Sequence, residues 1–238
     1  MKNCFKEKVV KDILIVIPAY NEEGSIETVV SNIVHQYPQF DYVVINDGSK
    51  DQTSKICHQH GFNIIDLPVN LGLAGAFQTG LRYAYEMGYK KAIQFDADGQ
   101  HLPEYIQDLS DKLDQGYNMT IGSRFVTQPR PNSLRMLGNI LISGAIKLTT
   151  GKTIKDPTSG MRMLDQSLIK EFAINLNYGP EPDTVSYLIR KGAKVAEVQV
   201  EMRERETGQS YLTLTRSIKY MWHMFASILV IQNFRLRK

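Results

Sequence analysis

Two aspartates separated by one residue follow a short apolar run in the middle of the chain. Asp96 and Asp98 come directly after residues 91–95, whose pattern predicts a buried strand, and Gln100 follows two residues later. Carboxylate and amide oxygens are the ligands that hard divalent cations prefer, and such a cation bridges phosphate oxygens and offsets the charge of a departing diphosphate. We therefore predict Mg²⁺ or Mn²⁺ at Asp96, Asp98 and Gln100, with His101 at the surface or behind these ligands.

Two further polar clusters follow predicted strands nearer the N-terminus. Residues 18–22, Pro-Ala-Tyr-Asn-Glu, come after a β-branched run, and Asp47 follows the next such run. We expect Tyr20 and Glu22 to face a flat ligand group, and Asp47 to accept a hydrogen bond from a base N–H. Taken alone, the first cluster is also typical of an ordinary strand-to-helix turn, and Asp47 is typical of a helix cap.

Four arginines in the second half of the chain are candidates for phosphate contact: Arg124, Arg135, Arg162 and Arg205. The planar guanidinium group donates two parallel hydrogen bonds that match the spacing of phosphate oxygens. Most arginines are solvated surface residues, so residue type alone does not select among these four.

The elements that must position these residues are strands alternating with helices. Such alternation predicts an α/β fold with a mostly parallel, doubly wound sheet flanked by helices, in which ligands bind beyond the carboxyl ends of the strands. The polar clusters lie at those ends, so folding would bring them to one rim. The predicted strands are residues 13–17, 42–45, 63–67, 91–95 and 119–122.

After Arg124 the alternation becomes less regular. We expect a mobile loop over 127–133, a turn at 156–160 and a strand over 195–202, with helices over 134–150 and 181–191. No internal repeat or linker is found. The chain is therefore interpreted as one catalytic domain, residues 1–210, followed by a C-terminal segment, residues 211–238.

The C-terminal segment has the pattern of an amphipathic helix. Polar residues recur every three or four positions, at Arg216, Lys219, His223 and Ser227, and most of the rest of the stretch to Ile231 is apolar or aromatic. A broad apolar face followed by a basic end is typical of a helix that lies on a lipid surface. Burial in the core or in an oligomer contact would give the same pattern.

Composition excludes several classes of protein. The 238 residues are 42% hydrophobic and 22% charged, which is ordinary for a globular domain, and the net charge of +3 is too small for a typical nucleic-acid binder. From Arg190 onward ten lysines and arginines stand against four acidic residues, so the excess of positive charge lies at this end. Two cysteines without metal spacing favour a reducing compartment. We expect neither a signal peptide nor a membrane-spanning helix.

Six motifs, taken together and in this order, resemble glycosyltransferase family 2, and within it the short bacterial type of the dolichyl- or polyprenyl-phosphate sugar synthase branch. The resemblance extends from about Ile13 to Tyr211. The motifs are Ile-Pro-Ala-Tyr-Asn-Glu-Glu (17–23), Asn-Asp-Gly-Ser-x-Asp-x-Thr (46–53), Asn-x-Gly (70–72), Phe-Asp-Ala-Asp-Gly-Gln-His (95–101), Gly-Ser-Arg (122–124) and Asp-Pro-Thr-Ser-Gly-Met-Arg (156–162).

The resemblance implies a GT-A (Rossmann-like) fold, a UDP- or GDP-sugar donor, a divalent metal and transfer with inversion. It assigns catalytic roles to Asp98, Arg124 and Arg135, the two arginines as ligands of an acceptor phosphate. It places Asp96, Asp98 and Gln100 on the metal. The residues implied to bind the nucleotide sugar are Pro18, Ala19, Tyr20, Glu22, Asp47, Asp96, Ala97, Asp98 and Arg205.

Two positions depart from the pattern of this branch. Tyr211 follows Gly208-Gln209-Ser210 where the branch usually has a lysine, and Asn139 stands where it often has an acceptor-side serine. Members of the branch often continue into transmembrane helices, whereas this sequence ends after one amphipathic segment. That difference points to a small membrane-protein partner, and self-association is a second way to cover the segment.

We therefore expect transfer of a hexose or N-acetylhexosamine to a polyprenyl (undecaprenyl) phosphate at the cytoplasmic face of the cell membrane, for cell-envelope glycan assembly or modification. A phosphate acceptor is already anionic, so it needs no general base. Three alternatives stay open. A family member that acts on a polysaccharide, lipid or protein hydroxyl would need a base such as Asp156 or Glu181. A nucleotidyltransferase would release pyrophosphate, and a non-enzymatic subunit would bind the nucleotide sugar without turnover.

Overall fold

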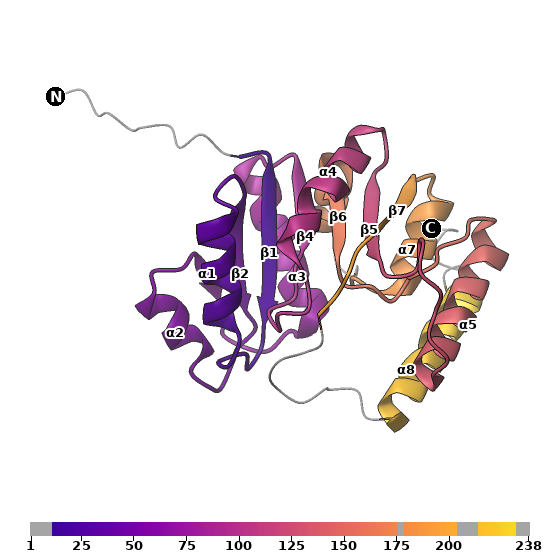
Figure 1. Cartoon of the computed structure of the whole chain (residues 1–238), viewed down its shortest axis with the longest axis horizontal. Coiled ribbons are helices and arrows are strands. Elements are labelled where there is room, and N and C mark those ends of the chain that lie inside the picture. The colour runs from indigo at the N-terminus through magenta and orange to yellow at the C-terminus, as the bar shows by residue number, and fades with distance from the viewer. Residues whose placement is uncertain (1–10, 176–178, 204–213, 232–238) are drawn as a thin grey trace.

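The centre of the protein is a mixed β-sheet. The computed structural model describes residues 11–175, 179–203 and 214–231. Within these ranges seven strands pair in the order β3-β2-β1-β4-β6-β5-β7 (Figure 1). The strands are β1 (Ile13–Ala19), β2 (Asp41–Asn46), β3 (Ile64–Asp66), β4 (Lys91–Gln94), β5 (Met119–Ser123), β6 (Arg162–Asp165) and β7 (Val195–Gln199).

Strand β1 shows why its sequence is apolar at every position. Leu14 and Val16 pack in the core on one face of the sheet, whereas Ile15 and Ile17 pack in the core on the other face. Because side chains alternate between faces, a strand covered on both sides needs apolar residues throughout. β1 pairs in parallel with β2 and with β4, in agreement with the predicted mostly parallel sheet.

Strand β6 was not predicted. It is only four residues long, begins with Arg162 and runs antiparallel to both β4 and β5. The pairing of Arg162 with Gln94 places the start of β6 beside the end of β4. The turn that precedes β6 therefore lies at the same edge of the sheet as the loop that follows β4.

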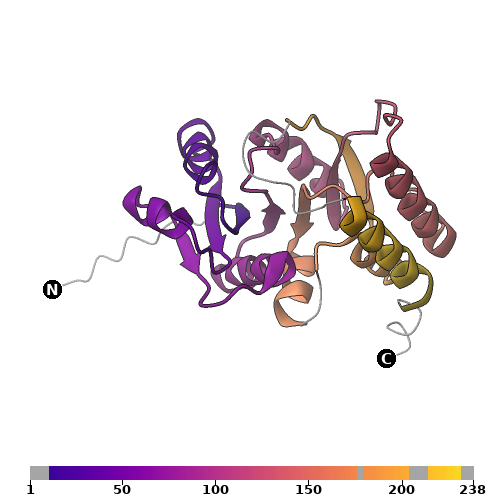
Figure 2. The ribbon, with the colours of Figure 1, turned by 90° about the horizontal axis from the view of Figure 1, so that it is seen from below.

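Helices cover both faces of the sheet (Figure 2). Those on one face pack around Ile15 and Ile17, and those on the other around Leu14 and Val16. The first group is α1 (Ile26–Gln36), α2 (Thr53–Gln59) and α4 (Ile106–Asp114), with the 3₁₀ turn η1 (Pro103–Tyr105) before α4. The second is α3 (Gly72–Met87), α5 (Leu134–Thr150), α6 (Gln166–Ile174), α7 (Pro182–Arg190), α8 (Leu214–Ala226) and the π-helical segment η2 (Ser227–Ile231).

The predicted helix over 134–150 is confirmed with the same bounds, the one over 181–191 is found as α7 with each end one residue shorter, and α6 was not predicted. The five strands predicted before residue 123 are found with ends shifted by one or two residues. The strand predicted over 195–202 ends at Gln199. These corrections leave the predicted fold class, α/β with a mostly parallel sheet flanked by helices, confirmed.

The C-terminal helix α8 packs along α5 and α7 (Figure 1). Met224 and Ile228 are buried in the core, and each such burial contributes roughly 1.5–3 kcal/mol. Met221 of α8 packs directly against Gly138 of α5, where a side chain would overlap with it. Residues 211–213 and 232–238 of the predicted segment lie outside the described residues. Among the described helices, none is long and apolar enough to cross a bilayer.

Candidate active site

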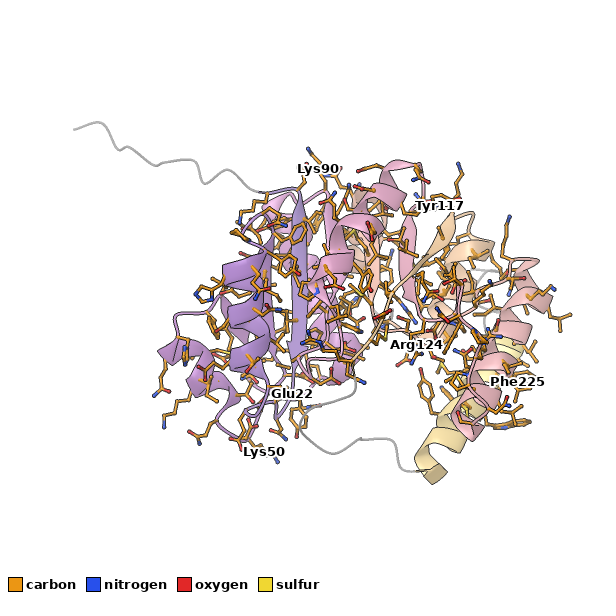
Figure 3. The ribbon with its side chains drawn as sticks, viewed as in Figure 1. Glu22, Lys50, Lys90, Tyr117, Arg124 and Phe225 are labelled. Atoms are coloured by element: carbon orange, nitrogen blue, oxygen red, sulfur yellow. The ribbon has the colours of Figure 1, made fainter. Side chains whose placement is uncertain are left out.

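A cavity of about 470 Å³, here named the strand-end cavity, opens at the carboxyl ends of β1, β2 and β4. Glu22 and Arg124 lie at this edge of the sheet, whereas Lys90 and Tyr117 lie at the opposite edge (Figure 3). Every residue predicted to bind the nucleotide sugar lines this cavity except Arg205, which is outside the described residues. The lining residues are Pro18, Ala19, Tyr20, Glu22, Asp47, Asn70, Gly72, Leu73, Ala76, Asp96, Ala97 and Asp98.

The turn after β1 is bonded to the turn after β2. Asn21 has a positive φ of 56°, a conformation that asparagine tolerates better than most residues. Its N–H donates to Ser49 Oγ at 3.0 Å, and its Oδ1 accepts the Lys50 N–H at 2.8 Å. The Glu22 N–H donates to Thr53 Oγ1 at 2.9 Å. These bonds join the two turns into one rim, which holds the residues on either side of Asn21 at the cavity.

Asp47 connects β2 to α3. It is 3% exposed, and its Oδ1 accepts the Leu71 N–H at 2.7 Å. The prediction that this turn caps the following helix is wrong, because α2 begins after Gln52 and the first helical N–H, that of Thr53, is bonded by Asp51. Asp47 instead fixes the loop that leads into α3, with its carboxylate on the cavity wall.

Asp96 and Asp98 lie on the loop after β4, which ends at Gln94. Asp96 Oδ1 accepts a hydrogen bond from Gln94 Nε2, and Asp98 Oδ1 accepts one from the Gln100 N–H, both at 3.1 Å. Gly99 has a φ of 80°, which allows the chain to turn back after Asp98. The loop thereby holds both carboxylates at the wall of the same cavity.

His101 is a supporting residue whose contacts the sequence analysis did not identify. Its ring is 4% exposed and packs edge-on against Phe95. Nδ1 accepts the Asp96 N–H at 2.9 Å, and Nε2 lies 3.5 Å from Asp96 Oδ2. The ring therefore fixes the backbone at Asp96 and lies beside its carboxylate.

Asp96 and Asp98 suit a cation that is held partly by the protein and partly by the phosphate oxygens of a ligand. Asp96 and Asp98 face the same cavity, and the Asp96 side chain is 34% exposed. Gln100, the third predicted ligand, does not line the cavity, and its amide donates to the Arg203 carbonyl at 3.3 Å. Within the described residues no three His, Cys, Asp or Glu side chains form a closed cation site. Proteins usually hold Mg²⁺ by one or two carboxylates together with substrate phosphates and water.

Arg124 forms a bidentate ion pair with Asp156. Nε donates to Oδ2 at 2.7 Å and Nη2 to Oδ1 at 2.9 Å, and the Arg124 N–H adds a third bond at 3.2 Å. Asp156 also accepts from Asn139 Nδ2 at 3.0 Å and from Thr158 Oγ1 at 3.2 Å. The Asp156 side chain is fully buried, whereas that of Arg124 is 25% exposed. Both oxygens of Asp156 are thus occupied, and the guanidinium plane of Arg124 is fixed.

The other candidate arginines differ in their surroundings. Arg162 is 3% exposed and donates to the carbonyl oxygens of Pro157, Ser159 and Glu181 at 2.7–3.2 Å. Burial lowers the pKa of Arg162. This side chain stabilises the turn before β6, so its interpretation as a phosphate ligand is wrong. Arg135 lies in the first turn of α5, and its side chain is outside the described part of the structure.

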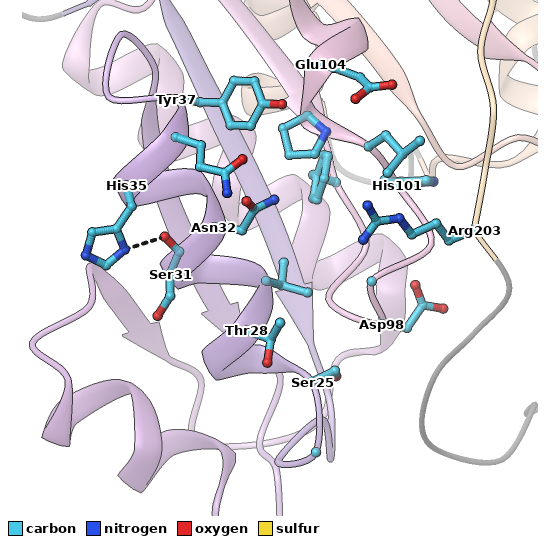
Figure 4. Close-up of a pocket in the computed structure, with 17 residues that line it drawn as sticks. Ser25, Thr28, Ser31, Asn32, His35, Tyr37, Asp98, His101, Glu104 and Arg203 are labelled. Carbon is cyan, nitrogen blue, oxygen red and sulfur yellow. Dashed lines mark hydrogen bonds between the residues drawn. The ribbon is translucent and has the colours of Figure 1, made fainter.

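A second cavity, of about 530 Å³, lies between α1 and the loop 98–104 (Figure 4). Thr28 and Asn32 of α1 form one wall, and Glu104 and Arg203 lie across from them. Asp98 lines both this cavity and the strand-end cavity. The loop that carries Asp96 and Asp98, here named the aspartate loop, therefore separates the two cavities, and a ligand in either cavity can contact Asp98.

A mostly parallel sheet with an Asp-x-Asp loop at its carboxyl edge is the architecture of a GT-A enzyme. A structure of glucosyl-3-phosphoglycerate synthase from Mycobacterium tuberculosis, in complex with Mn²⁺, UDP and glucosyl-3-phosphoglycerate, has this fold. It aligns with a TM-score of 0.69 at 18% identity and covers 93% of this chain and 80% of that one. The expected GT-A fold is therefore confirmed.

Sequence comparison assigns the family. The family model for glycosyl transferase family 2 matches residues 14–172, so the chain belongs to this family and is a glycosyltransferase. Polyprenol monophosphomannose synthase from Mycolicibacterium smegmatis is 27% identical over 213 residues, 84% of this chain and 80% of that protein. UDP-N-acetylglucosamine--dolichyl-phosphate N-acetylglucosaminyltransferase from Methanococcus voltae is 34% identical over 182 residues, 67% of this chain and 72% of that protein.

Proposed function

We propose that the chain transfers a hexose or N-acetylhexosamine from a UDP- or GDP-sugar to the phosphate of a polyprenyl carrier such as undecaprenyl phosphate. A phosphate oxygen of the acceptor attacks C1 of the sugar, the bond from C1 to the nucleoside diphosphate breaks, and the anomeric centre is inverted. The product would serve cell-envelope glycan assembly or modification. The names of the relatives from M. smegmatis and M. voltae, both transferases to polyprenyl-type phosphates, support this choice.

The strand-end cavity supports the proposed donor site. Tyr20, Glu22 and Asp47 on its rim would hold the nucleoside, with the buried Asp47 positioned to accept a base N–H. Asp96 and Asp98, which line the same cavity, would face the diphosphate. A cavity of about 470 Å³ lies within the range that encloses small-molecule ligands.

Asp96 and Asp98 would hold Mg²⁺ or Mn²⁺ together with oxygens of the donor diphosphate. When bound, the cation offsets the negative charge that develops on the leaving nucleoside diphosphate. The task of the chain is to keep the two carboxylates in place. Gln94 does so at Asp96, where His101 also holds the backbone, and the N–H of Gln100 does so at Asp98.

The choice of acceptor rests on the contacts of Asp156 and Glu181, the two carboxylates that could act as a general base. Asp156 has both oxygens bound by Arg124, and Glu181 accepts the hydroxyl hydrogen bond of Tyr220. A general base must reach the proton that it removes, and neither Asp156 nor Glu181 lines the strand-end cavity. A phosphate acceptor needs no base, so it fits this site better than a hydroxyl acceptor does. Arg124 and Arg135 would orient that phosphate.

The outer surfaces of α5 and α8 support contact with a membrane. Neither helix contains an acidic residue, and both contain basic ones. Exposed apolar side chains on helices that carry basic and no acidic residues suit the anionic cytoplasmic face of the cell membrane, where the lipid acceptor would be reached. Among the described side chains, the large apolar ones exposed on α5 and on the α8–η2 segment are Leu137, Ile140, Leu141, Leu148, Trp222 and Val230.

The proposal is tested with the full chain and a panel of UDP- and GDP-sugars, with undecaprenyl phosphate in mixed micelles and Mn²⁺ or Mg²⁺. Expected products are a nucleoside diphosphate and a lipid-linked sugar phosphodiester, identified by mass spectrometry. Transfer only to polysaccharide, lipid or protein hydroxyls would support the second type of family 2 reaction instead. Release of pyrophosphate, or donor binding without turnover in every combination, would overturn the proposal.

A further inference from the structure

Two hydroxyl groups of the C-terminal helical segment reach the N-terminal end of α7. The Tyr220 hydroxyl, on α8, donates a hydrogen bond to Oε2 of Glu181. The Ser227 hydroxyl, about two helical turns further on, donates to Oδ2 of Asp183 at 2.7 Å. Ser227 is 3% exposed, and Tyr220 packs against the core. These polar contacts add directional bonds to the apolar packing that holds α8.

The residue that receives the Tyr220 bond is also bonded to a buried arginine. The Glu181 carbonyl accepts Nη1 of Arg162 at 3.2 Å. Arg162 in turn donates to the carbonyls of Pro157 and Ser159 at 2.7 and 2.9 Å. Among the described residues no carboxylate lies within ion-pair distance of this guanidinium. Its position therefore depends on the carbonyl groups around it, including that of Glu181.

The turn that Arg162 holds makes two contacts with the candidate active site. At its start, Asp156 binds Arg124 by both oxygens. At its end, Gly160 lies so close to Asp96 that an added Cβ would be 2.8 Å from Oδ2. A shift of residues 156–160 would therefore move the proposed acceptor arginine and press on a proposed metal ligand.

We propose that Tyr220 is a positioning residue for the transfer reaction. Its hydrogen bond holds Glu181 in place, and the Glu181 carbonyl in turn holds Arg162. Arg162 then fixes the turn 156–160 together with the site residues that contact this turn. The inference rests on the proposed function for its kinetic assay. It gives α8 a part in the geometry of the active site that is distinct from contact with a membrane.

The direction of the effect follows from the chemistry of the pair. Burial raises the pKa of Tyr220, and the negative charge of Glu181 raises it further, so the phenol stays protonated and donates. Without the hydroxyl, the half-buried Glu181 carboxylate loses its tyrosine donor, and the local backbone relaxes. A displacement of about 1 Å at reacting groups can cost roughly 100-fold in rate. We expect a smaller shift here and a loss of about tenfold.

The test compares Tyr220→Phe with two matched variants of the full chain. Tyr85→Phe makes the same chemical change at an exposed tyrosine of α3, and Ser227→Ala removes the hydroxyl bond between η2 and α7. Tyr220→Phe is expected to lower kcat/KM for the polyprenyl phosphate about tenfold, with the Kd of the nucleoside diphosphate changed less than twofold. Ser227→Ala is expected to lower Tm without this kinetic effect, and Tyr85→Phe to match the wild type.

Two further measurements separate positioning from general destabilisation. Amide hydrogen exchange of residues 156–160 is expected to be faster in Tyr220→Phe than in Ser227→Ala, a readout that needs no substrate. The double variant Y220F/E181A is expected to lose no more activity than the less active of the two single variants, since each removes one partner of the same hydrogen bond. Wild-type exchange in Tyr220→Phe, or activity that falls in proportion to Tm in both hydroxyl variants, would overturn the inference. Absence of transfer by the wild type would count against the proposed function alone.

Discussion

Gly160 and Asp96 are in contact where β6 begins and β4 ends. A Cβ atom added at Gly160 would lie 2.8 Å from Oδ2 of Asp96, closer than real Cβ contacts. Because β6 is antiparallel to β4, the turn before one strand meets the loop after the other. The lack of a side chain at position 160 allows this approach, which joins the turn bonded to Arg124 with the aspartate loop.

Gly160→Ala is expected to disturb the proposed metal site without unfolding the protein. The added methyl group would displace the Asp96 carboxylate, so the Mn²⁺ concentration for half-maximal rate should rise and turnover should fall roughly 10- to 100-fold. Initial rates against Mn²⁺ concentration measure both effects. Gly144→Ala, on α5, adds a methyl group with nothing within 4 Å and should behave as the wild type. An unchanged Mn²⁺ response in Gly160→Ala would show that Asp96 can move without consequence.

Asp98→Asn is expected to abolish most metal-dependent transfer. The change keeps the shape of the side chain but removes a negative charge from the cavity wall, and loss of one strong electrostatic contact in an active site typically costs at least about 100-fold. Release of nucleoside diphosphate, with and without Mn²⁺, is the measurement. Asp108→Asn makes the same substitution at an exposed position of α4 and should leave the rate unchanged. If Asp98→Asn keeps full metal-dependent activity, the metal assignment is wrong.

Asp156→Asn separates an ion-pair role from a role as general base. The substitution leaves the Arg124 guanidinium without its buried counter-charge, and breaking a buried pair costs about 3–5 kcal/mol, or roughly 10 °C in Tm. We expect this loss of stability together with a raised KM for the acceptor phosphate. Thermal unfolding and acceptor kinetics are measured side by side, with Asp111→Asn as an exposed control. Complete loss of turnover at unchanged Tm would instead identify Asp156 as a base for a hydroxyl acceptor.

The fold could be predicted from the sequence wherever a residue pattern has only one structural explanation. The run 13–17 is apolar at every position because both faces of β1 are covered, and that requirement is visible without coordinates. β6 gave no such signal, since four residues are too few for a period and the first is an arginine. Only the structure shows that Arg162 is satisfied by three backbone carbonyls and is therefore tolerated inside.

The candidate site shows the same limit. The convergence of residues 20, 47, 96 and 98 on one cavity could be expected from the rule that parallel strands end at one edge. The partners of individual side chains could not, because they come from segments far apart in sequence. The bonds from Asp47 to Leu71 and from Arg124 to Asp156 are examples of such long-range pairing. The roles assigned to these residues in binding and catalysis stay predictions.

Cys57 is expected to resist thiol reagents in the folded protein. Burial raises the pKa of its thiol to about 11, and the negative charge of Asp66 acts in the same direction. The folded state thus favours the neutral thiol, a contribution to stability that is present at neutral pH and is lost as pH rises from about 9 through about 11. At pH 8 roughly one thiol in a thousand is ionised. In a Cys4→Ser background, absorbance of a released aromatic thiolate should show slow labelling at pH 8 and fast labelling in urea. Fast labelling of the native protein would contradict the burial of this thiol.

Leu148 and Trp222 provide the test of the proposed membrane contact, because they are the most exposed large apolar residues among the described side chains of α5 and α8, at 79% and 71%. Transfer of such a side chain from lipid to water costs about 1.5–3 kcal/mol, so each change to serine should weaken binding to vesicles of phosphatidylcholine and phosphatidylglycerol at least tenfold. Co-sedimentation measures this binding. Ile174→Ser, at a 57% exposed position of α6, is the matched control. Turnover with a short, water-soluble polyprenyl phosphate should not change. Wild-type vesicle binding combined with a shift from dimer to monomer in gel filtration would identify the surface as a contact between copies of the chain.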